Sequence, residues 1–221
     1  MKNNENGRSM IEMLGVLAII GVLSVGGLAG YAKMMAQYRI NATLQQIQTI
    51  SAKLSSLSAN GGSYQGLSNY TVYRLNALPA EMVTSVNDEN KTATLTNAYA
   101  GDVIIEPASV TAGECSEGAC DYQAYTFTYT ALSEEACVAL GTSTWSSSAN
   151  STFIGMGVGS ATNTENIKKS LKQDCTGSKQ DGYAVACAGS ASQVKIPMDM
   201  DVAINACACT DGNCVLVLKF F

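Results

Sequence analysis

The N-terminal part of the chain is dominated by one apolar run. After a short polar stretch, residues 1–7, no charged residue occurs between Met13 and Ala32. At about 1.5 Å per residue, a helix over this run spans the roughly 30 Å of hydrocarbon in a bilayer. A secretory signal peptide is not indicated, because the apolar run continues into a helical pattern without an A-x-A-like exit. The pattern therefore predicts a membrane-spanning helix.

An amphipathic pattern follows the apolar run directly. Apolar residues recur at intervals of three and four, the period of one helix face, at Ile40, Leu44, Ile47, Ile50, Leu54 and Leu57. Asn60-Gly61-Gly62 tolerates the left-handed backbone that ends helices, so we expect the helix to stop near Ala59. A continuous helix from about Ser9 to that point is roughly 75 Å long, and half of it lies outside the globular domain.

The remaining patterns are shorter. Aromatic residues alternate with small residues and threonine over Tyr122–Thr130, which predicts a strand. Ser133 with two following glutamates suits a helix N-terminus, and the helix runs through Cys137 to Leu140. The other expected elements are loops with one or two short strands over Ser63–Ala112, a strand over Phe153–Val158, a short helix over Asn166–Leu171, and a hairpin over Asp201–Phe221 that turns at Asp211-Gly212.

Composition excludes several classes of function. The chain has 221 residues and a formal net charge of −5, without a basic patch, so we expect one globular domain and no nucleic-acid binding. It has no histidine, which removes Ser-His-Asp, Cys-His and His-metal chemistry. A carboxylate-pair or Ser-Lys enzyme remains open, but we assign no catalytic residue. Asp199, Asp201 and Asp211 offer oxygen ligands for calcium, yet solvated turn acids are favoured because an EF-hand spacing is lacking.

The eight cysteines all lie between Cys115 and Cys214. Their even number predicts a disulfide-stapled domain in an oxidising compartment. Lys2 and Arg8 are matched by Lys33 and Arg39 beyond the apolar run, so basic residues do not set the orientation, and the cysteines place the C-terminal domain on the oxidising side. A metal site at Cys207, Cys209 and Cys214 is disfavoured, since a second ligand pair is lacking.

Local geometry selects one disulfide. If Asp211-Gly212 is a two-residue turn, Cys209 faces Cys214 in a non-hydrogen-bonded pair with Cα atoms roughly 4.5 Å apart, a separation that a disulfide accepts. Cys207 lies on the same strand face and is left for a longer link.

The segment Gly7-Arg8-Ser9-Met10-Ile11-Glu12 ahead of the uncharged run resembles the prepilin peptidase site of type IV pilins. The resemblance implies a leader of residues 1–7, cleavage between Gly7 and Arg8, a membrane and filament-core helix over 8–33, and a globular domain over 34–221. It also implies that Glu12 pairs with the α-amine of a neighbouring subunit during assembly. The alternative is that Glu12 is an ordinary interfacial acid.

Two features differ from the usual pilin pattern. The mature chain would begin with Arg8 rather than an apolar residue, and the proline common in the pilin helix is missing. Arg8 could pair with Glu12 four residues on, which would compete with the intersubunit role and bears on N-methylation of the new terminus. Gly21, Gly26, Gly27 and Gly30 offer flexible points or, equally, ordinary membrane-helix composition.

The C-terminal domain resembles the type IVb branch, including the thin-pilus pilins of conjugative plasmids. The similarity lies in the strand ending at Thr130, the cysteine-bearing helix Ala131–Cys137 and a terminal cysteine-containing strand. It implies an α+β fold in which a long N-terminal helix packs on an antiparallel sheet. It also makes Cys137 the candidate partner of Cys207, and Cys115 with Cys120 and Cys175 with Cys187 are then the remaining local pairs.

We therefore expect a structural subunit of a type IV pilus-like extracellular filament, for adhesion, motility or conjugative contact. The resemblance implies a prepilin peptidase, a pilus assembly platform, further copies of the chain and the bacterial inner membrane as partners, with the precursor's C-terminal domain in the periplasm. No cofactor is expected. The alternatives are a type II secretion pseudopilin and a membrane-anchored enzyme or receptor.

Overall fold

The computed structural model describes residues 6–58, 62–111, 120–145, 153–172, 175–188 and 194–221. The chain divides into two units, Met1–Arg39 and Ile40–Phe221. Helix α1, Asn6–Ser58, contributes residues to both units. The second unit begins within the part of the helix that the sequence assigned to the globular domain.

Helix α1 changes character where the second unit begins. From Met10 to Arg39 every residue is exposed except the half-buried Met35 and Ala36. From Ile40 onward one stripe is buried, formed by Ile40, Thr43, Gln46, Ile47, Ile50 and Leu54. The expected helical period is present, although Leu44 is only half-buried and two polar residues join the stripe. The long helix predicted from the sequence is confirmed, and the expected last residue, Ala59, lies outside the described residues.

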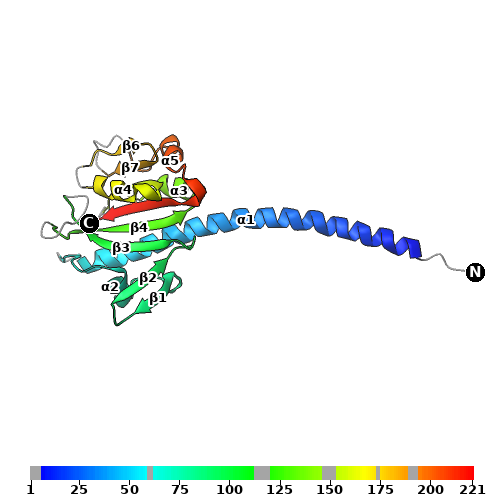
Figure 1. The fold of residues 1–221 in the computed structure, drawn as a ribbon, viewed down its shortest axis with the longest axis horizontal. Helices are drawn as coiled ribbons and strands as arrows, with labels where there is room; N and C mark the ends of the chain where they lie inside the picture. Colours follow the sequence, from blue (N-terminus) through cyan, green and yellow to red (C-terminus); the bar gives the residue numbers. More distant parts are fainter. Residues whose placement is uncertain (1–5, 59–61, 112–119, 146–152, 173–174, 189–193) are drawn as a thin grey trace, which may run out of the picture. The chain divides into compact units, whose positions relative to one another are not determined.

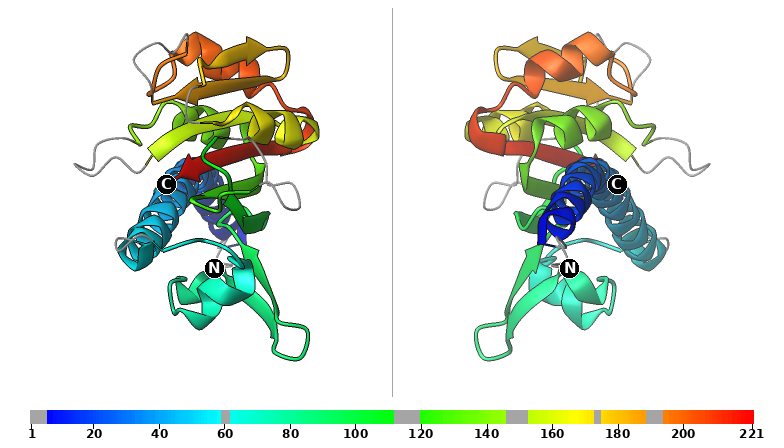
Figure 2. Two further views of the ribbon diagram at one scale, coloured as in Figure 1. Left: turned by 90° about the vertical axis from the view of Figure 1, so that its left-hand side faces the viewer. Right: turned by 90° about the vertical axis from the view of Figure 1, so that its right-hand side faces the viewer.

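Eight strands of the described chain form one antiparallel sheet in the order β1-β2-β3-β4-β8-β5-β7-β6. They are β1 (Val83–Asn87), β2 (Thr92–Thr96), β3 (Asp102–Ala108), β4 (Ala124–Leu132), β5 (Phe153–Ser160), β6 (Ser178–Gln180), β7 (Tyr183–Cys187) and β8 (Cys214–Phe220). The C-terminal strand β8 lies in the middle, between β4 and β5, and is the red arrow in Figure 1. Figure 2 shows the β1–β2 and β6–β7 pairs at opposite ends of this sheet.

Helices cover both faces of the sheet. They are α2 (Asn69–Arg74), α3 (Glu134–Gly141), α4 (Thr164–Ser170) and α5 (Met200–Ala206). Leu216 of β8 packs in the core that contains the buried stripe of α1, together with Cys137 of α3 and Ala203 of α5. The next residue, Val217, points to the other face and packs with Ile167 of α4. The second half of α1, α3 and α5 therefore share one face, and α4 covers the other.

Two glycines of β5 allow α4 to approach the sheet closely. A Cβ atom at Gly157 would collide with the Ile167 side chain, and one at Gly155 would lie 3.0 Å from the Leu171 side chain and 2.7 Å from the Ala186 carbonyl oxygen. The glycines that interrupt the apolar pattern of this strand thus leave the space that α4 occupies. The strand and the short helix were both predicted, and both are confirmed.

The region between α1 and β4 contains more regular structure than the sequence predicted. Three strands, β1 to β3, and helix α2 occupy a stretch for which one or two strands were expected. The apolar signal is weak here because β2 buries only Leu95 and β1 has no fully buried residue. Such half-exposed strands need few apolar side chains, so their alternation is hard to recognise.

The predicted hairpin over Asp201–Phe221 is wrong in its first half. Residues Met200–Ala206 form α5 and Thr210–Gly212 form a 3₁₀ turn, so only β8 is a strand. Val202, Ala203 and Ala206 are buried, which is a helical spacing that favours α5. A two-residue Asp-Gly connection occurs instead at Asp181-Gly182, between the paired residues that end β6 and begin β7.

Candidate functional site

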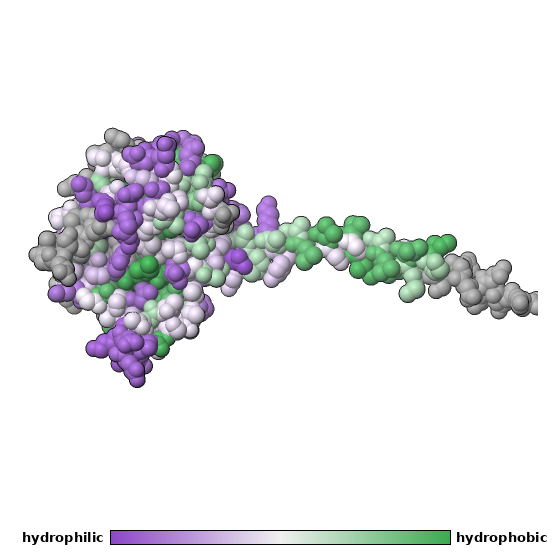
Figure 3. All heavy atoms as spheres, in the orientation of Figure 1, coloured by the Kyte–Doolittle hydropathy of each residue, from purple (hydrophilic) through white to green (hydrophobic). Residues whose placement is uncertain are grey.

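The N-terminal half of α1 exposes an unusual number of large apolar side chains. Between 53 and 75% of the residue surface is exposed at Met10, Ile11, Met13, Leu14, Val16, Leu17, Ile19, Ile20, Val22, Leu23, Val25, Leu28, Tyr31, Met34 and Tyr38. Figure 3 shows this apolar character along the visible face of the helix. Among the described residues α1 alone is long and apolar enough to cross a membrane, by length and composition.

Glu12 is an exposed residue within this apolar segment. Between Met10 and Ala32 it is the only charged residue of the sequence. A carboxylate in an apolar surrounding is costly unless an opposite charge accompanies it, so an incoming cation would stabilise it. Gly7 and Arg8 belong to α1, but the Arg8 side chain lies outside those described, and so does any pairing of Arg8 with Glu12.

Three disulfides join described cysteines. Cys137 bonds to Cys207 with Cα atoms 5.8 Å apart, Cys175 to Cys187 at 6.0 Å, and Cys209 to Cys214 at 5.5 Å. These pairs are the ones expected from the sequence. Cys120 is also disulfide-bonded, and its expected partner, Cys115, lies outside the described residues.

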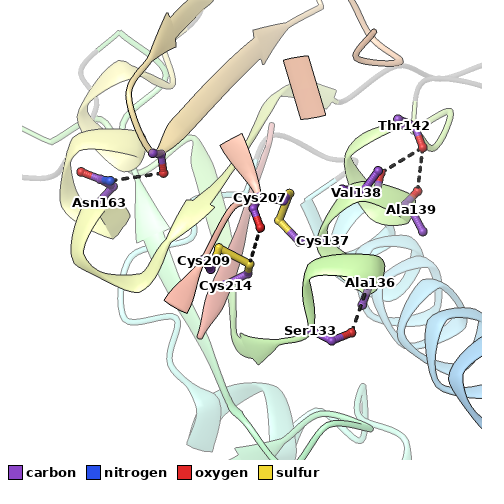
Figure 4. Close-up of a disulfide and its surroundings, with 11 residues drawn as sticks. Ser133, Ala136, Cys137, Val138, Ala139, Thr142, Asn163, Cys207, Cys209 and Cys214 are labelled. Carbon is purple, nitrogen blue, oxygen red and sulfur yellow. Dashed lines mark hydrogen bonds between the residues drawn. A yellow bond between two sulfur atoms is a disulfide. The ribbon is translucent and has the colours of Figure 1, made fainter. Parts of the chain in front are cut away.

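The local sequence around Cys137 and Cys207 determines where these two cysteines lie. The Ser133 hydroxyl oxygen accepts a hydrogen bond from the Ala136 backbone N–H at 3.3 Å and begins α3, which directs Cys137 into the core. Cys207 follows the last residue of α5 and is 1% exposed. The link between them therefore ties the two helices together, and Figure 4 shows the bond between Cys137 and Cys207.

The Cys209–Cys214 disulfide has a different geometric basis from the one expected. Cys209 precedes the 3₁₀ turn Thr210–Gly212 and is not in a strand, while Cys214 opens β8. The bond closes this turn and does not cross a hairpin. The sulfur atoms of Cys137, Cys209 and Cys214 lie within 4.8 Å of one another. All three are in disulfides, and since a metal needs thiolate ligands, the oxidised cluster does not offer them.

Two of the acidic residues considered for calcium, Asp199 and Asp201, lie at the start of α5. The Asp201 carboxylate lies 3.6 Å from the Lys179 ammonium group, and Asp199 precedes α5 at its N-terminus. The side chain of Asp211 lies outside those described. Asp199 and Asp201 are therefore exposed acids near a helix start.

The sequence pattern did not predict the buried lysine on β8. Lys219 is 0% exposed, and its ammonium group donates a hydrogen bond to the Leu171 carbonyl oxygen at 2.7 Å. Burial lowers the pKa of Lys219 to about 8, while the charge of Asp121 acts in the opposite direction. A lysine near the end of the otherwise apolar run Val215–Phe221 was the available signal.

Comparison with known proteins identifies the class. The model of the family described as PilS N terminal matches residues 37–196, most of the chain. The chain therefore belongs to this family, which is a family of type IV pilins, the structural subunits that polymerise into filaments.

Two solved structures are similar to the chain. The type IV b pilin from Salmonella typhi is 16% identical, with a TM-score of 0.49, over 80% of this chain and 97% of that one. TcpA, a type IV pilin from Vibrio cholerae El Tor biotype, is 13% identical, with a TM-score of 0.45, over 83% and 99%. No curated protein matches the chain.

Proposed function

We propose that this chain is the precursor of a pilus subunit. A prepilin peptidase removes residues 1–7, and the mature subunit enters a filament through the apolar segment of α1. The observation that carries the proposal is the exposure of every large apolar side chain of α1 from Met10 to Met34. Such a surface needs a lipid or protein environment, since burial of apolar area is the main driving force of association.

The two environments follow one another in assembly. Before assembly, residues 8–33 lie in the inner membrane and the disulfide-bonded domain lies in the periplasm, where disulfides persist. On polymerisation, with the help of an assembly platform, the apolar segments of neighbouring copies replace lipid. The helix then forms the core of the filament.

Glu12 acts as a register device in this proposal. Its carboxylate pairs with the α-amine that cleavage exposes on a neighbouring subunit. A subunit that docks out of register would leave a buried charge without a partner, which costs several kcal/mol. The interaction thus selects the correct position more than it adds affinity.

In this proposal the filament serves adhesion, motility or conjugative contact. Immunogold electron microscopy of a producing strain with an antibody against the globular domain tests the proposal. We expect labelled surface filaments that disappear when the gene is deleted. Label confined to the cell envelope would favour a type II secretion pseudopilin, and an uncut, unpolymerised chain would favour a membrane-anchored enzyme or receptor.

A further inference from the structure

Two disulfides lie side by side at the junction of α3, α5 and β8. The Cys137–Cys207 and Cys209–Cys214 bonds are adjacent in Figure 4. The Cys137 sulfur is within 4.8 Å of both sulfurs of the other bond. The Cys214 sulfur is also 3.4 Å from the Cys207 carbonyl oxygen. A thiolate at Cys137 would therefore lie within a few ångströms of a disulfide that it can attack.

We propose that these four cysteines form a thiol–disulfide exchange centre, in which the Cys209–Cys214 disulfide oxidises the Cys137 and Cys207 thiols during folding. This activity is separate from filament assembly. It concerns how the long-range link forms inside a closed core.

The exposure of the cysteines and their separation along the chain indicate which of the two disulfides forms first. Cys209 is 8% exposed, whereas Cys137, Cys207 and Cys214 are 0 to 1% exposed, so an external oxidant meets Cys209 first. Cys209 and Cys214 are 5 residues apart and Cys137 and Cys207 are 70 apart. Closing the shorter loop costs less entropy, so the local disulfide forms earlier.

The transfer has two balanced steps. The Cys137 thiolate attacks one sulfur of the Cys209–Cys214 bond, that bond breaks, and the other sulfur leaves as a thiolate. The Cys207 thiolate then attacks the Cys137 sulfur, which forms the Cys137–Cys207 bond and releases the second thiolate. Two thiols and one disulfide are present before and after, and the two protons pass to Cys209 and Cys214. A small-molecule disulfide, such as oxidised glutathione, then reoxidises that pair and is itself reduced to two thiols.

The Cys175–Cys187 bond provides a matched control. Cys187 pairs in register with Gly155, which also pairs with Lys219, so it lies on the face of the sheet that α4 covers. Cys214 lies on the opposite face, in the core that contains Cys137 and Cys207. The sheet therefore separates the control pair from the exchange centre.

Trapping in a Cys207→Ser variant tests the proposal directly. The full chain, in detergent micelles and at high dilution, is refolded with oxidised glutathione, quenched by alkylation and digested with trypsin. Cys207→Ser leaves Cys137 without its resolving partner. We expect a disulfide between the Cys137 peptide, Thr92–Lys168, and the peptide Ile196–Lys219 that carries Cys209 and Cys214. In the control variant Cys175→Ser, Cys187 remains an alkylated thiol. An alkylated Cys137 beside an intact Cys209–Cys214 bond would overturn the proposal.

Refolding kinetics provide a second measurement that does not depend on the trapped variant. The double variant Cys209→Ser/Cys214→Ser lacks the disulfide that oxidises Cys137 and Cys207. It should form the Cys137–Cys207 bond roughly tenfold more slowly, because the oxidant must then reach two buried thiols directly. The control Cys175→Ser/Cys187→Ser should keep the wild-type rate. Equal rates in the wild type and in Cys209→Ser/Cys214→Ser, or equal slowing in both double variants, would contradict the proposed exchange.

Discussion

Gly157 determines how closely α4 packs on β5. Any side chain at this position would occupy the space that Ile167 fills. We predict that Gly157→Val lowers the free energy of unfolding by about 1–3 kcal/mol, since the core must rearrange to accept the added atoms. Chemical denaturation of the oxidised chain measures the change.

Gly141 provides the matched control for this substitution. A Cβ atom at Gly141 would make ordinary contacts at 3.5 Å and beyond. Gly141→Ala should therefore change stability by less than about 1 kcal/mol. Equal effects of the two substitutions would contradict the close packing of α4.

Lys219 makes stability depend on pH in a defined interval. Its pKa falls from 10.5 to about 8 because it is buried. Between these values the unfolded chain binds more protons than the folded chain, so the free energy of unfolding rises with pH, by at most about 3 kcal/mol. Denaturation between pH 8 and 9.5 should show about half of this rise for the wild type, and the rise should be absent from Lys219→Met. Equal slopes in both proteins would rule out Lys219 as the cause.

The charge of Glu12 should affect assembly but not folding. We predict that Glu12→Ala and Glu12→Gln both insert in the membrane and fold, yet give few or misregistered filaments, because both lack the carboxylate that is proposed to pair with an α-amine. Ser24→Ala, in the same apolar segment, is the control and should assemble normally. Filament yield from sheared cells measures the effect. Normal yield from both Glu12 variants would assign Glu12 to the membrane interface alone.

At the scale of elements, helices with strong patterns were predicted best. Helix α1 has a clear periodicity and α3 a capping residue, and α4, β4 and β5 lie close to the expected ranges. The sequence does not contain a local signal for strand order, so the central place of β8 could not be inferred. Sheet order depends on contacts between residues far apart in the chain.

The disulfide pairs show how a correct pairing can rest on a wrong local structure. The bond from Cys209 to Cys214 was expected across a hairpin, but it closes a 3₁₀ turn. Short separation brings two cysteines within bonding distance in several backbone conformations. The exposed Glu12 was predictable because a charge stands out in an apolar run, whereas the hydrogen bond of Lys219 depends on the distant Leu171.

The link between α3 and α5 should stabilise the domain most. The Cys137–Cys207 bond closes a 70-residue separation and the Cys209–Cys214 bond a separation of 5. In the loop-entropy model, removing the first by paired Cys→Ala substitution costs about 4 kcal/mol and removing the second about 2 kcal/mol. Thermal unfolding of the two double variants compares them. A larger loss from the Cys209 and Cys214 variant would contradict this ranking.

The whole molecule combines a domain with its own core and a helical segment that needs partners. Buried residues of the second unit form the core around the sheet, whereas the described residues of α1 before Ile40 bury almost no apolar surface within the chain. An exposed apolar surface of this size marks a site of contact with lipid or with other protein chains. Filament formation as proposed requires in addition that the leader be removed and that the chain leave the membrane.

Sequencing the N-terminus of the subunit in filaments sheared from the cell surface tests this requirement most directly. We predict a sequence that begins at Arg8, without residues 1–7, and a Gly7→Leu variant that stays in the membrane at full length. Gly15→Leu, at an exposed position of the same helix with open space around it, should be processed normally. Surface filaments whose subunit still begins at Met1, or normal trimming of Gly7→Leu, would contradict the account.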